Sequence, residues 1–155
     1  MTRALGFNVD AVSDYRKAVA QSDVVITCTT SREPLLTAAD VPEGCFVAGV
    51  GADSDTKHEL APDLLVHGTL VVDVLEQCAR IGDLHHALDA GAMTRDDVHA
   101  ELAEVVVGRQ PGRRSATEIT VFDSTGTALQ DVASALVVYE RALAEGRGTV
   151  VQLGA

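Results

Sequence analysis

Apolar residues along this chain fall into short runs that alternate with stretches of helical spacing. The runs are rich in Val and Ile and contain few polar residues; they are Val24–Thr27, Phe46–Val50, Thr69–Val72 and Ile119–Phe122. Such runs are typical of strands buried on both faces of a parallel sheet, because half-exposed antiparallel strands alternate polar and apolar residues. The pattern therefore predicts a layered α/β fold. Alternation over Phe7, Val9 and Ala11 predicts a further edge strand.

Three stretches carry helix signals. Ser13 is placed to cap a helix that runs through residue 21, and Thr94 followed by Asp97 resembles a capping box that opens a helix ending before residue 108. From about Thr127 to Glu145, apolar residues recur at i, i+4, i+7 and i+11 and are followed by two glycines. This last pattern predicts a long amphipathic helix.

Length and charge limit the kinds of protein this can be. A chain of 155 residues is the size of one domain, so we expect residues 1–155 to form a single domain. Its 12 Lys and Arg against 23 Asp and Glu give a net charge of −11, the wrong sign for binding phosphates of a duplex or an anionic membrane. We therefore expect no nucleic-acid partner and no membrane partner.

The cysteines favour a reducing compartment. Cys28, Cys45 and Cys78 are odd in number and have no CxxC spacing, which argues against a disulfide framework or a zinc site. The first ten residues lack an apolar signal-peptide core, and no run of 18 apolar residues occurs. We expect a cytoplasmic protein without a metal ion.

Polar and glycine residues follow three of the predicted strands. They form the stretches Thr27–Ser31, Gly49–Lys57 and Asp123–Gly126. In an open parallel sheet, ligands bind beyond the carboxyl ends of the strands, so these three stretches are expected to converge on one crevice.

Three motifs in these stretches resemble one family. VVITCTTSREPLL, GVGADSDTKHEL and TVFDSTGTALQDVASALVVYERA occur in the order found in the carboxyl-terminal half of the ornithine cyclodeaminase and mu-crystallin family. The resemblance runs from about residue 20 to residue 148. That family includes NAD(P)-dependent cyclodeaminases, which are lyases, and oxidoreductases such as ketimine reductases and amino-acid dehydrogenases. The resemblance implies a partial Rossmann-like three-layer α/β sandwich with a mostly parallel sheet and a long carboxyl-terminal helix.

The resemblance also implies roles for particular residues. Asp53 corresponds to the family's general acid/base near the nicotinamide, and burial in a partly desolvated crevice would raise the pKa of such a carboxyl toward the working range. Ser124, in the motif F-x-S-x-G, would lie near the nicotinamide end. The remaining residues that would contact NAD or NADP are Thr27, Val50, Gly51, Ala52 and Lys57.

Parts of the family pattern are absent from this sequence. It contains no GxGxxG turn to bind a pyrophosphate, which in the family precedes the region matched here. Without the strands around that turn, Val24–Thr27 would present a free edge. We therefore expect a homo-oligomer, a complementing amino-terminal half, or a fragment of a longer gene product, with a small amino or imino acid as substrate if the protein is active.

Alternatives remain open for the site and for the function. Asp53 can cap a helix near Thr56, Ser124 can cap the long helix, and Lys57 can be a surface residue. Arg113 and Arg114 either meet an NADP phosphate or belong to an exposed loop. For the whole chain, the hypothesis of a truncated NAD(P)-dependent enzyme competes with two alternatives. These are a non-catalytic α/β interaction or dimerisation module and one half of a split enzyme.

Overall fold

The computed structural model describes residue 6 and residues 8–151. The chain divides into two compact units, Met1–Thr125 and Gly126–Ala155, which are described separately. No helix in the described part of the chain is long and apolar enough to cross a membrane.

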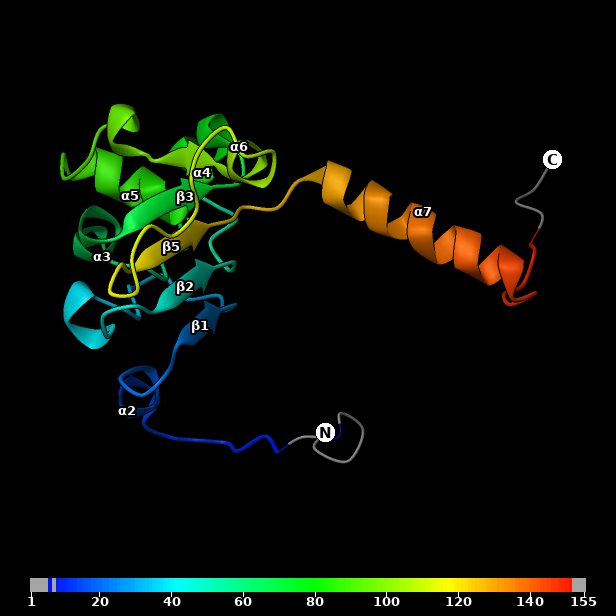
Figure 1. The fold of residues 1–155 in the computed structure, drawn as a ribbon, viewed down its shortest axis with the longest axis horizontal. Coiled ribbons are helices and arrows are strands. Elements are labelled where there is room, and N and C mark those ends of the chain that lie inside the picture. The colour runs from blue at the N-terminus through cyan, green and yellow to red at the C-terminus, as the bar shows by residue number, and fades with distance from the viewer. Residues whose placement is uncertain (1–5, 7, 152–155) are drawn as a thin grey trace. The chain divides into compact units, whose positions relative to one another are not determined.

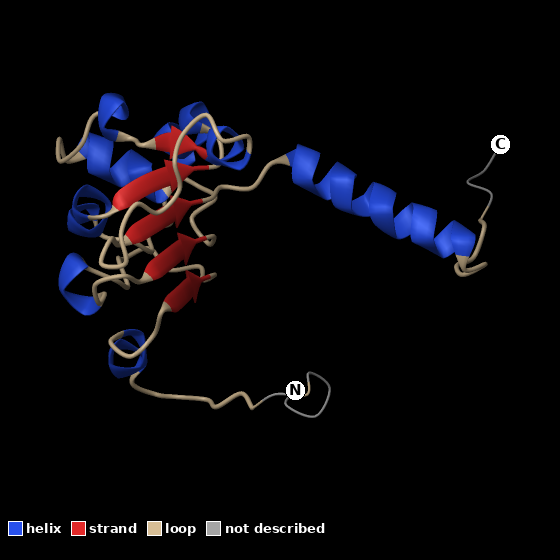
Figure 2. Cartoon of the chain, in the orientation of Figure 1, coloured by secondary structure: helices blue, strands red, loops and turns tan. Residues whose placement is uncertain are grey.

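The first unit contains a five-stranded sheet in which every pair of neighbouring strands is parallel (Figures 1 and 2). The strand order is β1-β2-β5-β3-β4. This sheet confirms the predicted α/β class, and four strands fall within one residue of the apolar runs. The strands are β1 (Val24–Thr27), β2 (Phe46–Gly49), β3 (Thr69–Val72), β4 (Ala100–Glu101) and β5 (Thr120–Asp123).

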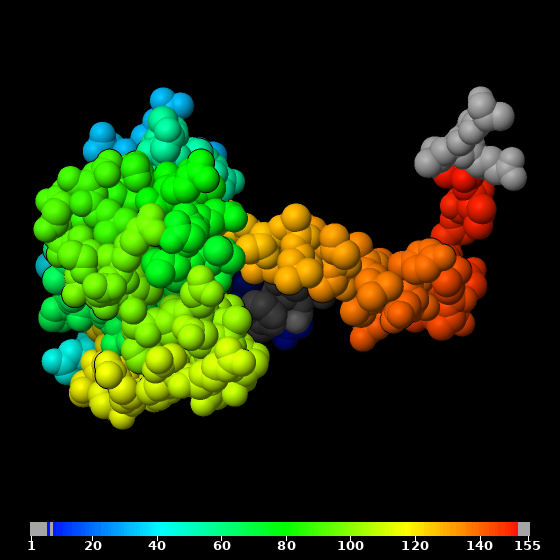
Figure 3. Space-filling view, turned by 90° about the horizontal axis from the view of Figure 1, so that it is seen from above, coloured from blue at the N-terminus to red at the C-terminus, as the bar shows by residue number. Residues whose placement is uncertain are grey.

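Short helices precede and connect these strands. In the view from above in Figure 3, green and yellow-green residues, the colours of α4, α5 and α6, cover much of the visible face of this unit. The helices are α2 (Tyr15–Val19), α3 (Pro62–His67), α4 (Leu75–Ile81), α5 (Asp83–Asp89) and α6 (Leu102–Val106), with 3₁₀ turns η1 (Ala38–Asp40) and η2 (Arg95–Asp97).

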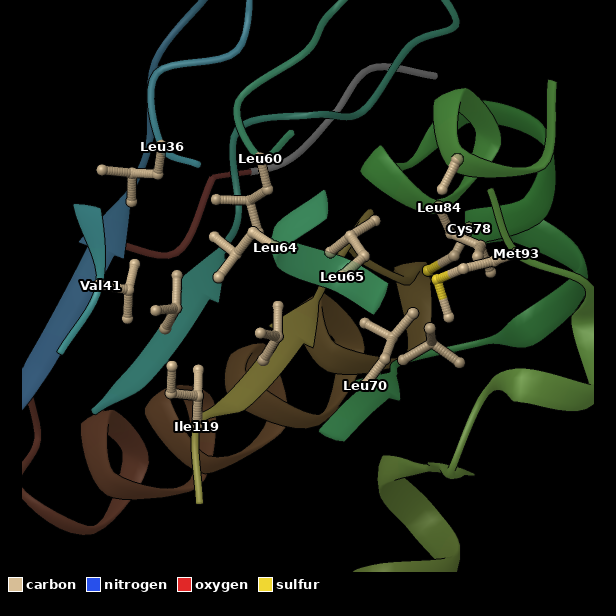
Figure 4. Packing of buried hydrophobic residues seen from close by; sticks show 14 of the residues in the cluster. Leu36, Val41, Leu60, Leu64, Leu65, Leu70, Cys78, Leu84, Met93 and Ile119 are labelled. Carbon is tan, nitrogen blue, oxygen red and sulfur yellow. The ribbon is translucent and has the colours of Figure 1, made fainter. Parts of the chain in front are cut away.

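The hydrophobic core lies between one face of the sheet and helices α3, α4 and α5 (Figure 4). Leu70 of β3 packs with Leu64 and Leu65 of α3 and with Leu84 of α5, and all four are buried. Burial of these leucines stabilises the contact between the helices and the sheet.

The opposite face of the sheet is open in part. Phe46, Val71 and Phe122 line an apolar groove of about 550 Å³ together with two residues of α6. At the edge, Val24 and Ile26 of β1 are 57% and 66% exposed. Within the described residues, β1 has a hydrogen-bonded neighbour on one side only.

The second unit is built on α7 (Ala128–Ala144). This helix confirms the predicted long helix to within one residue at each end. Gly146 and Gly148 follow it with φ angles of +63° and +104°, a backbone region that glycine adopts without strain.

Three local predictions were wrong. Residues 8–12 form no strand, and Phe7 lies outside the described residues. The first helix is capped by Asp14, whose carboxylate accepts from the backbone N–H of Lys17 at 3.2 Å, so Ser13 lies outside it. The helix expected after Thr94 is divided, because residues 100–101 pair with β3 and the sheet hydrogen bonds override the helical spacing.

Candidate functional site

Three adjacent strands end in a row at the carboxyl edge of the sheet. Thr27, Gly49 and Asp123 are aligned in register on β1, β2 and β5. The backbone N–H of Val50 donates to the Thr27 carbonyl at 2.9 Å, and that of Ser124 donates to the Gly49 carbonyl at 2.9 Å. The loops that carry Thr27, the stretch from Val50 and Ser124 therefore lie side by side.

Glu59 joins the first two loops. Its side chain is completely buried and accepts three hydrogen bonds: from the Thr27 hydroxyl at 2.7 Å, from the Thr29 N–H at 2.6 Å and from the Gly51 N–H at 2.8 Å. A carboxylate that accepts several such bonds is held in one position. Glu59 thus fixes the end of β1 against the loop after β2.

Gly51 has to be small because Glu59 lies against it. A Cβ at position 51 would lie 2.4 Å from Glu59 Oε1 and 2.6 Å from the Thr29 nitrogen. The Ala52 side chain is fully buried, whereas Val50 is 37% exposed. Of these three residues, Val50 presents the most side-chain surface to solvent.

Asp73 holds the third loop. It follows β3, and its Oδ2 accepts from the Ser124 hydroxyl at 3.0 Å and from the Thr125 N–H at 2.8 Å. The Cys78 thiol donates to Asp73 Oδ1 at 3.0 Å, and burial raises the pKa of that thiol. Cys78 is therefore a structural donor and not a nucleophile.

Asp53 and Lys57 form an ion pair in the loop after β2. Lys57 Nζ lies 2.5 Å from Asp53 Oδ1, and the Asp53 side chain is 56% exposed. No helix begins near Thr56, so Asp53 does not cap one. This exposure differs from the partly desolvated crevice that the resemblance implied.

The two arginines of the 108–115 loop lie at the other edge of the sheet. Arg113 donates to the Gly44 carbonyl and to the Thr120 hydroxyl, and Arg114 pairs with Glu118. Thr120 begins β5, so these arginines lie at the amino ends of the strands and not beside the candidate site.

His58, His85 and His86 pack against one another. The rings of His58 and His86 stack with centroids 3.9 Å apart, and His86 Nε2 donates to the Lys57 carbonyl at 2.7 Å. Burial lowers the pKa of His58. His86 is half-buried. Among the described residues, no group of three or more His, Cys, Asp or Glu is arranged to hold a metal.

Sequence reasoning missed the two carboxylates that organise the site. Glu59 stands in a polar stretch, yet it directly precedes the apolar residues Leu60 and Ala61, which is a signal of burial. Asp73 directly follows a strand at the edge where ligands bind. The loop after β3 lacks the cluster of glycine and hydroxyl residues that follows β1, β2 and β5, so the sequence pattern does not mark Asp73.

A parallel sheet with polar loops joined at its carboxyl edge defines an α/β domain of the Rossmann-like class. The chain belongs to the ornithine cyclodeaminase/mu-crystallin family, whose sequence profile matches residues 1–146. The match therefore begins earlier than the region from about residue 20 that the motifs indicated.

Three similar proteins illustrate this membership. The chain is 44% identical over 133 residues to an alanine dehydrogenase of Archaeoglobus fulgidus, covering 86% of this chain and 41% of that protein. It resembles the structure of an archaeal alanine dehydrogenase dimer with bound NAD (TM-score 0.87, 40% identity, 99% of this chain and 47% of that one). It also resembles Thermococcus litoralis Δ1-pyrroline-2-carboxylate reductase in complex with NADH and L-proline (TM-score 0.90, 35% identity, 97% and 47%). The chain spans less than half the length of each.

Proposed function

We propose that this chain forms the nicotinamide side of a dinucleotide site in an NAD(P)-dependent enzyme that acts on a small amino or imino acid. The observation that carries the proposal is the joining of three strand-end loops at one edge of the sheet, by Glu59 between the first two and by Asp73 at the third. Similarity to an alanine dehydrogenase and to a reductase that binds NADH and proline supports the cofactor and the substrate class.

The residues present fit one end of a dinucleotide and not the other. Two buried hydroxyl groups held by carboxylates, an exposed apolar residue and an ion pair lie at the carboxyl edge, a set that suits a ring and a ribose. The glycine-rich turn that binds a pyrophosphate does not occur in these 155 residues. We propose that polypeptide outside this sequence supplies the wall that binds the pyrophosphate.

Each candidate residue has a role in this proposal. A bound nicotinamide would supply hydride transfer to or from the substrate carbon. Asp53 would move the proton on the substrate nitrogen, with one carboxylate oxygen held by Lys57 and the other turned to the substrate. Ser124 and Thr27 would orient the ring and ribose, while Val50, Gly51 and Ala52 would form the floor beneath them.

As the partner of this chain we propose a complementing amino-terminal segment. We propose that it pairs with the open edge of β1 and covers Val24 and Ile26, which would otherwise expose an apolar edge strand to water. The same segment would place Asp53 in a less hydrated setting. A dimer is expected for the completed protein, as in the archaeal alanine dehydrogenase.

Titration with NADH tests this proposal. The chain is prepared alone and together with the segment of the Archaeoglobus relative that it does not match, and NADH fluorescence is followed in both. We expect saturable binding only for the combination, and turnover with alanine, ornithine or pyrroline-2-carboxylate that Asp53→Asn abolishes while NADH binding remains. Asp55→Asn, which changes an exposed carboxylate in the same loop, is the matched control. Absence of NADH binding in both preparations would favour the non-catalytic interaction module.

A further inference from the structure

Two carboxyl oxygens are buried beneath the site without a hydrogen-bond partner. Asp83 and Asp123 are both completely buried. Asp83 Oδ1 accepts from the backbone N–H groups of Glu59 and Leu60 at 2.8 and 3.1 Å, and Asp123 Oδ2 accepts from that of Leu84 at 2.9 Å. The other oxygen of each carboxyl, Asp83 Oδ2 and Asp123 Oδ1, has no partner among the described residues.

Two glycines allow these two carboxyls to come close to each other. Gly49 is aligned with Asp123 on the neighbouring strand, so both residues face the core side of the sheet, about 4.8 Å apart. A Cβ added at Gly49 would lie 3.1 Å from Asp83 Oδ2. A Cβ added at Gly82, the residue before Asp83, would lie 2.9 Å from Asp123 Oδ1. Each glycine leaves room for the carboxyl of the other segment.

Two ionised carboxylates in this space would repel each other, and each would keep a buried oxygen without a donor. A single proton removes both difficulties, because one oxygen then donates to the other. We propose that Asp83 and Asp123 share one proton between Asp83 Oδ2 and Asp123 Oδ1, and that this bond positions the end of β5 against the start of α5.

The electrostatic surroundings agree with one shared proton near neutral pH. Burial, followed by the charge of Asp83, raises the pKa of Asp123 to about 8. Burial raises the pKa of Asp83 to about 6, although hydrogen bonds from the backbone N–H groups of Leu60 and Glu59 lower it. The charge of the Glu59 carboxylate also raises this pKa, and His86 lowers it. Asp73 also faces Asp123 and raises its pKa, and the thiol of Cys78 on α4 lies beside the same carboxyl. The pair therefore retains one proton between about pH 6 and pH 8.

The shared proton acts on the candidate site through its neighbours. Asp123 directly precedes Ser124, and Asp83 holds the backbone of Glu59, whose side chain joins the loops after β1 and β2. Asp83 and Asp123 are therefore positioning residues that lie one layer below the site. Loss of the proton would loosen the loop that begins at Ser124 together with the two loops that Glu59 joins.

The pH dependence of unfolding tests this inference. An aspartate in the unfolded chain ionises near pH 4, so between pH 6 and 8 the folded pair binds one proton more than the unfolded chain. The pair then raises the unfolding equilibrium constant about tenfold for each pH unit, that is about 100-fold from pH 6 to pH 8. In Asp123→Asn and in Asp83→Asn, an amide hydrogen replaces the shared proton, and we expect this 100-fold rise to disappear.

The experiment is urea unfolding of the 155-residue chain and its variants at several pH values. Asp96→Asn, which changes an exposed carboxylate, is expected to keep the wild-type pH dependence. In the wild type at pH 7, the infrared spectrum should contain the carbonyl band of a protonated carboxyl, and Asp123→Asn should lack it. A wild-type slope retained in both amide variants, or a wild-type spectrum without the band, would overturn the inference. Because the band is measured on the wild type, the test stands even if a variant does not fold.

Discussion

Replacing Glu59 by Gln tests whether one buried carboxylate holds the site together. The carboxylate accepts from two backbone N–H groups on opposite oxygens, Thr29 N at Oε1 and Gly51 N at Oε2. Glutamine has the same shape but only one oxygen, so in either orientation of the amide one of these N–H groups meets an NH₂ group.

The expected loss of stability follows from that unpaired N–H. A buried donor left without an acceptor costs about 1–3 kcal/mol, and loss of a hydrogen bond to a charged group is of similar size. We expect Glu59→Gln to lower the free energy of unfolding by about 2 kcal/mol, which moves the urea midpoint by about 1 M for a domain of this size.

Urea titration followed by circular dichroism at pH 7 measures this change. Glu33→Gln, the same replacement at an exposed position in the loop after β1, is the matched control. Its urea midpoint should equal that of the wild type within error. If Glu59→Gln were as stable as Glu33→Gln, the three hydrogen bonds to Glu59 would not hold the loops, and the account of the site would be wrong.

Two further changes test other parts of the structure. Gly51→Ala should lower the free energy of unfolding by about 1–3 kcal/mol, because the added methyl group would lie 2.6 Å from the Thr29 nitrogen; Gly112→Ala, whose methyl group meets only Val105 at 3.8 Å, should change it little, and equal midpoints in urea would contradict this reasoning. Hydrogen bonds from Arg114 and Thr69 lower the pKa of Glu118 to about 2, so its contribution to stability is present above the unfolded value near 4.5 and is lost as pH falls toward 2. Glu118→Gln should therefore flatten the loss of stability in acid titrations between pH 4.5 and 2, and an unchanged acid limb would contradict the assignment.

The strands were predictable because their signal is strong and local. Each apolar run belongs to a strand buried on at least one face, and β1 and β3 begin and end at the predicted residues. The long helix was equally clear, since its apolar spacing continues for several turns and glycines follow it. These features depend on near neighbours in the sequence.

The short elements and the buried acids were not predictable in the same way. β4 has two residues, and only its pairing with β3 distinguishes it from the start of a helix. Asp83 lies at the start of a short helix, where an acidic residue is ordinary, and its burial depends on contact with β5. Such residues acquire their roles from distant segments, so local patterns do not reveal them.

The closeness of Gly49 to Asp83 makes these two positions interdependent in mutagenesis. A side chain at position 49 would lie against Asp83 Oδ2 and 2.8 Å from Leu60 Cδ1, so most single replacements there should be rejected. A smaller residue at position 83 would return some of that space. In a library that varies both positions, tolerated replacements at 49 should therefore be found chiefly with a shortened residue at 83, a form of epistasis that scans of single substitutions would not detect.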